Sequence, residues 1–347
     1  MEWTIELEDY ISGVQWSPDG SRLAASTVTG LMAVFDATTG SEHQYLRAHV
    51  QPITRLKWSP RLRNSTSDDS TRLATASHDG TAILWNPESP RSEGEIVAIL
   101  DCGKKHLWVE QCAWSFDGNF LATAAGKIVR VWTRDGTLVR HYEHAKRTVT
   151  DLAWHPTLHE LAVASYGGVS LYRIDEETLY CLLPIQASIL ALAWSPDGSV
   201  IAAGLQENAV QFWRLPFHDG DDAPSAMRGY PEKVRTLAFD RTGAYLATPS
   251  SRGVAVWEFL RGGPEGTTPV IIEGHLARVT QAAFQHKGHL LASADESGLV
   301  LISQPSINNQ TLKAETYQHE VSQLAWSPDD QRIAIGTERG IVDVWKV

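Results

Sequence analysis

The side chains best suited to chemistry in this sequence are its 13 histidines, since an imidazole can bind a metal ion or transfer a proton near neutral pH. Two pairs lie close together in the sequence: His286 and His289 are three residues apart, and His155 and His159 are four residues apart. That spacing holds zinc when a helix places both rings on one side, whereas the flanking residues here predict hairpin turns. We therefore expect solvated histidines in these turns and no bound metal ion.

Carboxylates and thiols give equally little sign of a catalytic centre. The acidic run at 219–222 could attract calcium, but it lacks the ligand spacing and the distal glutamate of an EF-hand. The three cysteines have no C-x-x-C spacing, and Cys112 has no obvious base beside it. Motifs of nucleotide-binding proteins, zinc proteases and serine hydrolases are absent. The sequence therefore predicts a protein that is not an enzyme and that needs no cofactor.

Composition and charge argue against several further classes of protein, including those that bind nucleic acid or membranes. The chain has 347 residues, of which 43% are hydrophobic, and a formal net charge of −11. An acidic surface argues against non-specific binding to nucleic acid or to an anionic membrane. The N-terminal residues contain no apolar signal-peptide core, and no run of about 18 apolar residues occurs. We expect a cytoplasmic protein with reduced thiols, monomeric by itself, that binds neither nucleic acid nor membrane.

One phrase, V-x-x-L-A-W-S-P-D-G, recurs along the whole chain. The elements that position any functional side chains must therefore be built from this repeat. A β-branched residue stands five positions before an aromatic residue in each of eight copies. The aromatic residues are Trp16, Trp58, Trp114, Trp154, Trp194, Phe239, Phe284 and Trp326. Each is followed by a turn, an L-A-x-x strand, a second turn and a third strand that ends in an aromatic residue, except for Ser303 in the seventh copy. Short strands between Ser/Pro/Asp/Gly turns predict an all-β fold.

On these residues the chain resembles the WD40 family, most clearly in its second repeat. That repeat reads AH at 48–49, ITRLKWSP at 53–60 and LATASHDGTAILW at 73–85. The resemblance covers essentially the whole chain and implies one β-propeller domain over residues 1–347, built from four-stranded antiparallel blades around a channel. Eight repeats predict eight blades. The chain stops after the third strand of the last set, so residues 2–7 are expected to complete that blade and close the ring.

The resemblance also implies a buried hydrogen-bond tetrad of His, Ser or Thr, Asp and Trp within a blade. Only the second repeat has all four residues, which gives them a structural role: His49, Thr75, Asp79 and Trp85. The seventh repeat keeps His275 and Ser293 but has Ser297 and Ser303 in place of Asp and Trp. Repeat four keeps His144 alone, repeat six has Tyr230, Thr248 and Trp257, and repeats one, five and eight lack most of the set.

Partners of such propellers commonly bind the face where the loops before the first strand and after the second strand meet. Eight residues occupy the positions that the family uses there: Tyr10, His78, Trp108, Glu110, Leu190, Lys233, Arg235 and Arg278. Large apolar side chains among them are typical anchors of an interface. The three cations predict a basic patch that suits an acidic or phosphorylated peptide. Alternatively, Trp108 packs under its own loop and the cations pair with neighbours such as Glu232.

We therefore expect a non-catalytic scaffold that binds proteins or peptides on this face. One alternative is a small-ligand-binding or metal-dependent enzymatic propeller that uses the channel. That function requires carboxylates and histidines near one channel end, where the sequence offers Glu110 and His106. His78, His106 and His144 form the best remaining metal candidate, at one rim of neighbouring repeats. A second alternative is a structural subunit of a larger complex.

Overall fold

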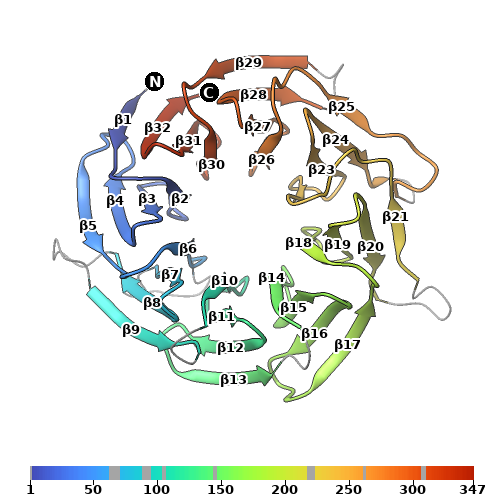
Figure 1. Cartoon of the computed structure of the whole chain (residues 1–347), viewed down its shortest axis with the longest axis horizontal. Helices are drawn as coiled ribbons and strands as arrows, with labels where there is room; N and C mark the ends of the chain where they lie inside the picture. Colours follow the sequence, from blue (N-terminus) through green and yellow to red (C-terminus); the bar gives the residue numbers. More distant parts are fainter. Residues whose placement is uncertain are drawn as a thin grey trace.

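Eight four-stranded antiparallel sheets form a ring around a central channel (Figure 1). The computed structural model describes residues 2–61, 71–87, 95–103, 107–143, 147–216, 223–260, 263–305 and 310–347. Blades 1 to 8 are numbered along the chain, beginning with the sheet β2-β3-β4-β5. This arrangement confirms the predicted eight-bladed propeller. Within the described ranges, the chain has no helix with the length and apolar character that a membrane crossing needs.

Each blade has four strands that run from the channel outward. The innermost strands are β2 (Ile11–Trp16), β6 (Ile53–Trp58), β10 (Val109–Trp114), β14 (Val149–Trp154), β18 (Ile189–Trp194), β22 (Ala238–Phe239), β26 (Val279–Phe284) and β30 (Val321–Trp326). The second strands are β3 (Arg22–Thr27), β7 (Leu73–Ser77), β11 (Phe120–Ala125), β15 (Glu160–Ser165), β19 (Val200–Leu205), β23 (Tyr245–Ser250), β27 (Leu291–Asp295) and β31 (Arg332–Thr337). The third strands are β4 (Leu31–Asp36), β8 (Thr81–Asn86), β12 (Ile128–Thr133), β16 (Gly168–Arg173), β20 (Val210–Arg214), β24 (Gly253–Glu258), β28 (Leu299–Gln304) and β32 (Ile341–Lys346). The outermost strands are β5 (Glu42–Arg47), β9 (Glu95–Asp101), β13 (Leu138–Glu143), β17 (Leu179–Pro184), β21 (Ser225–Met227), β25 (Val270–Ile272), β29 (Gln310–Thr316) and β1 (Trp3–Glu6).

The N-terminal strand closes the ring, as predicted. β1 pairs antiparallel with β32 (Figure 1), and in this pairing Trp3 lies opposite Val344. The hydroxyl of Thr4 donates a hydrogen bond to Asp343 at 2.7 Å, so side chains also join β1 to β32. Both edges that an open array of blades would leave exposed are thereby paired.

The second strand of each blade is buried on both faces, because a neighbouring blade covers each side. All five residues of β7 are buried, and so are all six of β15 and β19. This explains why the second strands are almost continuously apolar in sequence, whereas the residues of outermost strands such as β9 and β29 are mostly exposed or partly exposed. Apolar burial of this kind is the main favourable term in folding.

The tryptophans at the ends of the innermost strands do more than fill space. In six blades the indole N–H donates a hydrogen bond to the backbone carbonyl that precedes the equivalent aromatic residue of the preceding blade. These bonds join Trp16 to Ala325, Trp58 to Gln15, Trp114 to Lys57, Trp154 to Ala113, Trp194 to Ala153 and Trp326 to Ala283, at 2.9–3.3 Å. Phe239 and Phe284 have no N–H, so the two contacts that blade 6 makes with its neighbours lack this link.

Blade 6 is also irregular within its own sheet. Its innermost strand β22 contains two residues, where the other innermost strands contain six. Pro249 of β23 occupies the position that Ala76 has in blade 2, where Ala76 pairs with Arg55. Proline has no backbone N–H to donate, so the ladder between first and second strands continues only at Ala238 and Phe239.

Candidate functional site

Because consecutive strands of a blade are antiparallel, successive loops alternate between the two faces of the ring. Loops between the first and second strands, and between the third and fourth, lie at one end of every blade. Loops between the second and third strands, and those leading into the next blade, lie at the other end, which we call the top face. The candidate partner-binding residues all lie on or near loops of the top face.

The top face of blades 2 and 3 presents an exposed tryptophan on a fixed support. Trp108, directly before β10, is 57% exposed and stacks on His78 from the turn between β7 and β8. Their ring centroids are 4.4 Å apart and their planes differ by 18°. Glu110 contacts the same histidine, with its Oε1 3.4 Å from Nε2 of His78. Trp108 therefore does not pack under its own loop, and three of the candidate residues are brought together.

A second exposed apolar side chain, Val50, lies in a neighbouring loop of the same face and was missed from the sequence. Val50 lies in the loop between β5 and β6 and is 85% exposed. The same loop is fixed on the turn that carries His78, because the Pro52 carbonyl accepts a hydrogen bond from the His78 N–H at 3.1 Å. A branched apolar residue at a loop tip, directly after a buried histidine, is the signal that could have identified it. We refer to Val50, His78, Trp108 and Glu110 as the Trp108 surface.

The hydrogen-bond tetrad of blade 2 lies beneath the Trp108 surface. Nδ1 of His49 lies 2.8 Å from Asp79, and its Nε2 lies 2.8 Å from the Thr75 hydroxyl, which also accepts a bond from the Trp85 indole at 3.0 Å. Burial alone would raise the pKa of Asp79, but hydrogen bonds from His49 and Thr81 outweigh it and hold that pKa at about 2. The tetrad thus anchors the turn that presents His78.

Blade 7 contains a related network whose acidic residue comes from a position that the family pattern does not indicate. His275 contacts the Ser293 hydroxyl at 2.7 Å, as its residue types indicate. Its other ring nitrogen, however, lies 3.1 Å from Asp295 at the end of β27, and Ser297 donates to the same carboxylate. The acidic partner therefore exists, two positions earlier than in blade 2. Ser303, in place of tryptophan, is buried with no hydrogen-bond partner in the part of the chain that the structure describes.

Tyrosine takes the place of histidine in two further blades. In blade 6 the Tyr230 hydroxyl contacts Thr248 at 2.9 Å and accepts from Trp257 at 2.7 Å. Blade 8, in which the sequence showed few residues of the tetrad, also has a hydrogen-bond network centred on a tyrosine. There Tyr317 donates to Asp343 at 2.6 Å and accepts from the Trp345 indole at 2.5 Å. Buried polar groups are thus paired, although not always by the expected residues.

The three cations that were expected to form one basic patch differ in their surroundings. Arg278 is paired with Glu296, whose Oε1 lies 2.9 Å from the arginine Nε. Hydrogen bonding and charge from Glu296, followed by Glu232 and Glu320, raise the pKa of Arg278. Arg278 therefore adds no net positive charge to this part of the top face. Lys233 is half-buried and Arg235 exposed, and neither forms an ion pair within the described ranges.

Tyr10 lies in an acidic part of the top face. Its phenol is half-buried, and burial together with the charges of Glu320 and Glu338 raises its pKa. Burial and the neighbouring charges of Glu296 and Glu338 also raise the pKa of Glu320. Tyr10 is thus separate from the Trp108 surface in both position and charge.

Leu190 occupies a position that other blades use for structural hydrogen bonds. The equivalent hydroxyls of Thr54, Thr280 and Ser322 donate to the first carbonyl of the next blade's innermost strand, at 2.6, 3.0 and 2.8 Å. Leu190, like Glu110 and Arg235, carries no hydroxyl and cannot form this bond. Those three side chains therefore take no part in this hydrogen-bond link between blades.

Both histidines of the first pair bond to neighbouring groups of the protein. His155 is buried and its Nδ1 accepts from the backbone N–H groups of Thr157 and Leu158, while His159 contacts Asp117 at 2.8 Å. Among the described residues, no three His, Cys, Asp or Glu side chains come together in a way that could hold a metal ion. His106, His144 and the acidic run at 219–222 lie outside the described residues. Burial raises the pKa of the Cys112 thiol to about 11, which leaves it a poor nucleophile.

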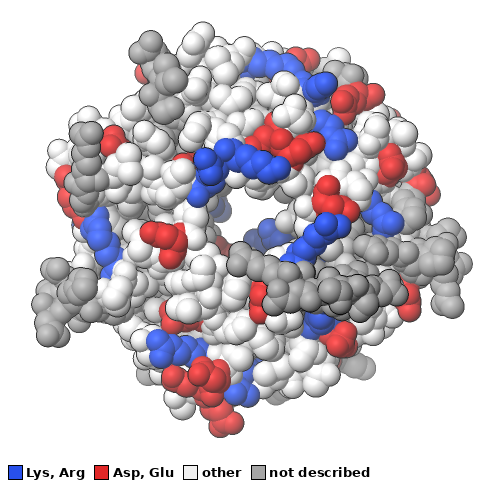
Figure 2. Space-filling view, turned by 180° about the vertical axis from the view of Figure 1, so that it is seen from behind, with Lys and Arg blue, Asp and Glu red and all other residues white. Residues whose placement is uncertain are grey.

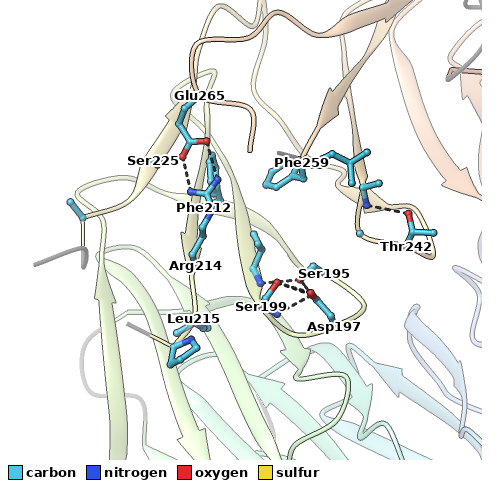
Figure 3. Close-up of a pocket in the computed structure, with 16 residues that line it drawn as sticks. Ser195, Asp197, Ser199, Phe212, Arg214, Leu215, Ser225, Thr242, Phe259 and Glu265 are labelled. Atoms are coloured by element: carbon cyan, nitrogen blue, oxygen red, sulfur yellow. Dashed lines mark hydrogen bonds and ion pairs between the residues drawn. The ribbon is translucent and has the colours of Figure 1, made fainter. Parts of the chain in front are cut away.

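A cavity of about 640 Å³ opens on the opposite face, between blades 5 and 6 (Figure 3). Arg214 and Glu265 form an ion pair of 2.7 Å across it, and the Ser225 hydroxyl donates to the same carboxylate (Figure 3). The bond from Arg214 outweighs burial and holds the pKa of Glu265 at about 2. These polar groups bind each other, so the cavity resembles a structural junction between blades more than a ligand site.

Comparison with known families supports the repeat assignment along much of the chain. The family described as "Anaphase-promoting complex subunit 4 WD40 domain" matches residues 2–61. The family described as "WD domain, G-beta repeat" matches residues 40–86, 95–133, 179–214 and 309–346.

Curated relatives are similar at low identity. An anaphase-promoting complex subunit cdc20 from Dictyostelium discoideum is 23% identical over 262 residues, which cover 64% of this chain and 52% of the relative. A WD repeat and SOCS box-containing protein 1 from Mus musculus is 29% identical over 260 residues, covering 58% and 59%. The chain thus spans about half the length of the relatives it matches. The crystal structure of the computationally designed Ika8 protein shares the fold, with a TM-score of 0.80, 21% identity and coverage of 99% of this chain and 98% of that one.

Proposed function

Because this chain is a WD40-repeat β-propeller, we propose that it is a non-catalytic scaffold that binds a partner protein on its Trp108 surface. The observation that carries the proposal is the exposed indole of Trp108, held flat against His78. A rigid aromatic side chain loses little conformational entropy on binding, and Trp is among the most frequent anchors of interfaces. Val50, on the loop whose Pro52 carbonyl accepts from the His78 N–H, adds exposed apolar area to the same face.

The chemistry around the indole defines the partner segment. Trp108 and Val50 favour an apolar or aromatic side chain, and Glu110 at the edge favours a hydrogen-bond donor or a cation next to it. Lys233 and Arg235, elsewhere on the top face, would contact acidic or phosphorylated residues farther along the segment. A role in binding proteins is consistent with one of the relatives, an anaphase-promoting complex subunit cdc20, because a subunit of a complex contacts other proteins.

The test compares two exposed apolar residues on opposite faces. Trp108→Ala removes the proposed anchor, whereas Leu158→Ala removes a leucine that is 53% exposed in a loop of the other face. Affinity purification from the native source with mass spectrometry identifies the proteins that the wild-type chain retains. We expect the Trp108→Ala variant to bind them about 30-fold more weakly, as the loss of an anchor worth about 2 kcal/mol implies. The Leu158→Ala variant should bind as the wild type does.

Equal recovery of every partner by Trp108→Ala and by the wild type would show that the top-face site is wrong. Selective loss in Leu158→Ala would place the main interface on the other face. Thermal unfolding of both variants controls for folding, since neither exposed side chain should change the midpoint appreciably.

A further inference from the structure

The central channel contains a pair of cations with too little negative charge around them. Arg55 and Lys57 lie two residues apart on β6, so both side chains are on the same side of the strand. With Gln111 of β10 and Asp151 of β14 they line a space of about 410 Å³ between the innermost strands of blades 2 to 5. Figure 2 looks into the central opening and shows basic side chains at its rim and inside it.

The arginine is held in place, and the lysine is not. Nε of Arg55 donates to Oε1 of Gln111 at 2.9 Å, and its Nη1 donates to the Thr54 carbonyl at 2.8 Å. Gln111 is fixed in turn by a bond of 2.7 Å from its Nε2 to the Thr150 carbonyl. The guanidinium therefore has one fixed orientation with donors to spare. The Lys57 ammonium has no hydrogen-bond or ion-pair partner among the side chains that the structure describes.

Asp151, the one carboxylate among the described residues that line this space, is already bonded elsewhere. Oδ1 of Asp151 accepts from its neighbour's N–H, that of Leu152, at 2.9 Å, and Oδ2 accepts from the Leu192 N–H at 2.8 Å. Burial raises the pKa of Asp151 despite these bonds and the nearby cations, which weakens its capacity to neutralise them. Burial and the charge of Arg55 lower the pKa of Lys57, as expected for a cation that lacks a counterion.

We propose that this part of the channel is a binding site for a small phosphate-type oxyanion, held between Arg55 and Lys57. The fork of a fixed guanidinium matches two oxygens of a phosphate group, and the ammonium adds a point charge beside it. An anion here offsets the cost of placing two like charges in a confined space, in a chain whose net charge is −11. Trp58 and Trp114 also line this space.

The site is independent of the Trp108 surface, because it uses the channel side of the innermost strands instead of the loops. A partner protein and a small anion could thus bind the same chain without sharing a residue. The volume suits an inorganic oxyanion or a small phosphorylated molecule, since small-molecule sites range from about 300 to 1,000 Å³.

Isothermal titration of the purified chain with inorganic phosphate, in chloride buffer at constant ionic strength, tests the proposal. The wild type should show saturable binding at one site, and acetate should bind more weakly. Lys57→Gln and Arg55→Gln should each weaken phosphate binding about tenfold or more, which is what the loss of one charged hydrogen bond implies. Arg61→Gln is the matched control, because Arg61 follows the same strand and is exposed. It should leave the affinity unchanged.

Asp151→Asn provides a prediction in the opposite direction. Removing the competing negative charge should tighten phosphate binding several-fold, which a merely structural role of Asp151 would not do. If Lys57→Gln fails to fold, Lys57→Arg keeps the charge and should keep the binding, whereas Lys57→Met removes the charge and should weaken the binding about tenfold or more. The absence of saturable binding, equal affinity for acetate, or equal loss in Arg61→Gln would overturn the proposal. Trp108→Ala should bind phosphate as the wild type does, so this test and that of the proposed function fail separately.

Discussion

Blades 2 and 6 occupy equivalent places in the ring but differ in the length of their strands and in their hydrogen-bond networks. Blade 2 has four strands of five to seven residues and the network of His49, Thr75, Asp79 and Trp85. In blade 6 the innermost strand has two residues and the outermost three, and its network joins Tyr230, Thr248 and Trp257. The apolar pattern is the same in both blades. Apolar periodicity is thus sufficient to place a blade in the ring, and the polar contacts determine how firmly it is held.

The contacts between blades differ in the same way. Trp58 and Trp114 link blade 2 to both of its neighbours through indole hydrogen bonds, while blade 6 and the blade after it carry Phe239 and Phe284 at these positions. The firmly held side of the ring carries the Trp108 surface and the cations of the channel. This agrees with the principle that a binding site works best on a rigid support.

The largest expected effect comes from breaking the blade 2 network at its centre. Thr75→Val keeps the shape of the side chain but leaves the Trp85 N–H and a ring nitrogen of His49 buried without a partner. Two such groups should lower the free energy of unfolding by about 3 kcal/mol. Tyr230→Phe in blade 6 should cost about half as much, because its neutral network is smaller. Urea denaturation measures both, and Thr178→Val, at an exposed position, should change little. Equal costs in the two blades would contradict the comparison.

Hydrogen exchange should separate the two blades without any substitution. The backbone amides of residues 235–237 lie outside the ladder that Pro249 interrupts, whereas those of residues 54–57 lie in a full strand. We expect the blade 6 segment to exchange about 100-fold faster, equivalent to about 2.7 kcal/mol less protection. Exchange detected by mass spectrometry on matched peptides checks this, and equal protection would show that blade 6 is held by contacts other than its ladder.

The two networks should also respond to opposite ends of the pH range. The pKa of Asp79 is lowered from 3.8 to about 2, so its contribution to stability is complete above pH 4 and is lost as the pH falls toward 2. The pKa of Tyr230 is raised from 10.0 to about 12, so its contribution is complete below pH 10 and is lost as the pH rises toward 12. Each is worth about 2 kcal/mol at most.

Urea denaturation of Asp79→Asn and Tyr230→Phe at pH 3, 7 and 11 measures these contributions. The difference between Asp79→Asn and the wild type should shrink at pH 3, where the wild-type carboxylate begins to be protonated. The difference for Tyr230→Phe should shrink at pH 11 instead. A pH dependence that is identical in the two variants would refute the assignment of the two networks.

The smallest effect concerns the links between blades. Trp114→Phe removes the indole bond to the Lys57 carbonyl and makes that contact resemble those of blade 6. The free energy of unfolding should fall by about 1 kcal/mol, the net value of one hydrogen bond. Trp108→Phe is the control, since the exposed indole makes no such bond, and it should remain within about 0.5 kcal/mol of the wild type. A loss as large as that of Thr75→Val would mean that packing at Trp114 dominates.

Much of the fold could be predicted because the periodic spacing of apolar and aromatic residues along the chain determines it. The spacing of the aromatic anchors is sufficient to predict eight blades, and the position of residues 2–7 relative to the last set predicts closure. The residues of the blade 2 network could be chosen because one repeat matches the family pattern at all four positions. Less of the candidate site could be predicted. Trp108, His78 and Glu110 were named separately, but no pattern in the sequence shows that they touch.

The remaining contacts depend on which residues the closed ring brings together. Thr4 and Asp343 are separated by 339 positions and become partners only when β1 joins β32. Asp295 supports His275 from an unexpected position because a carboxylate reaches the ring nitrogen from either place. The pairing of Arg278 with Glu296 and the isolation of Lys57 in the channel have the same origin. Apolar burial follows residue type and period, which the sequence contains, whereas electrostatic pairing follows distance, which exists only once the chain has folded.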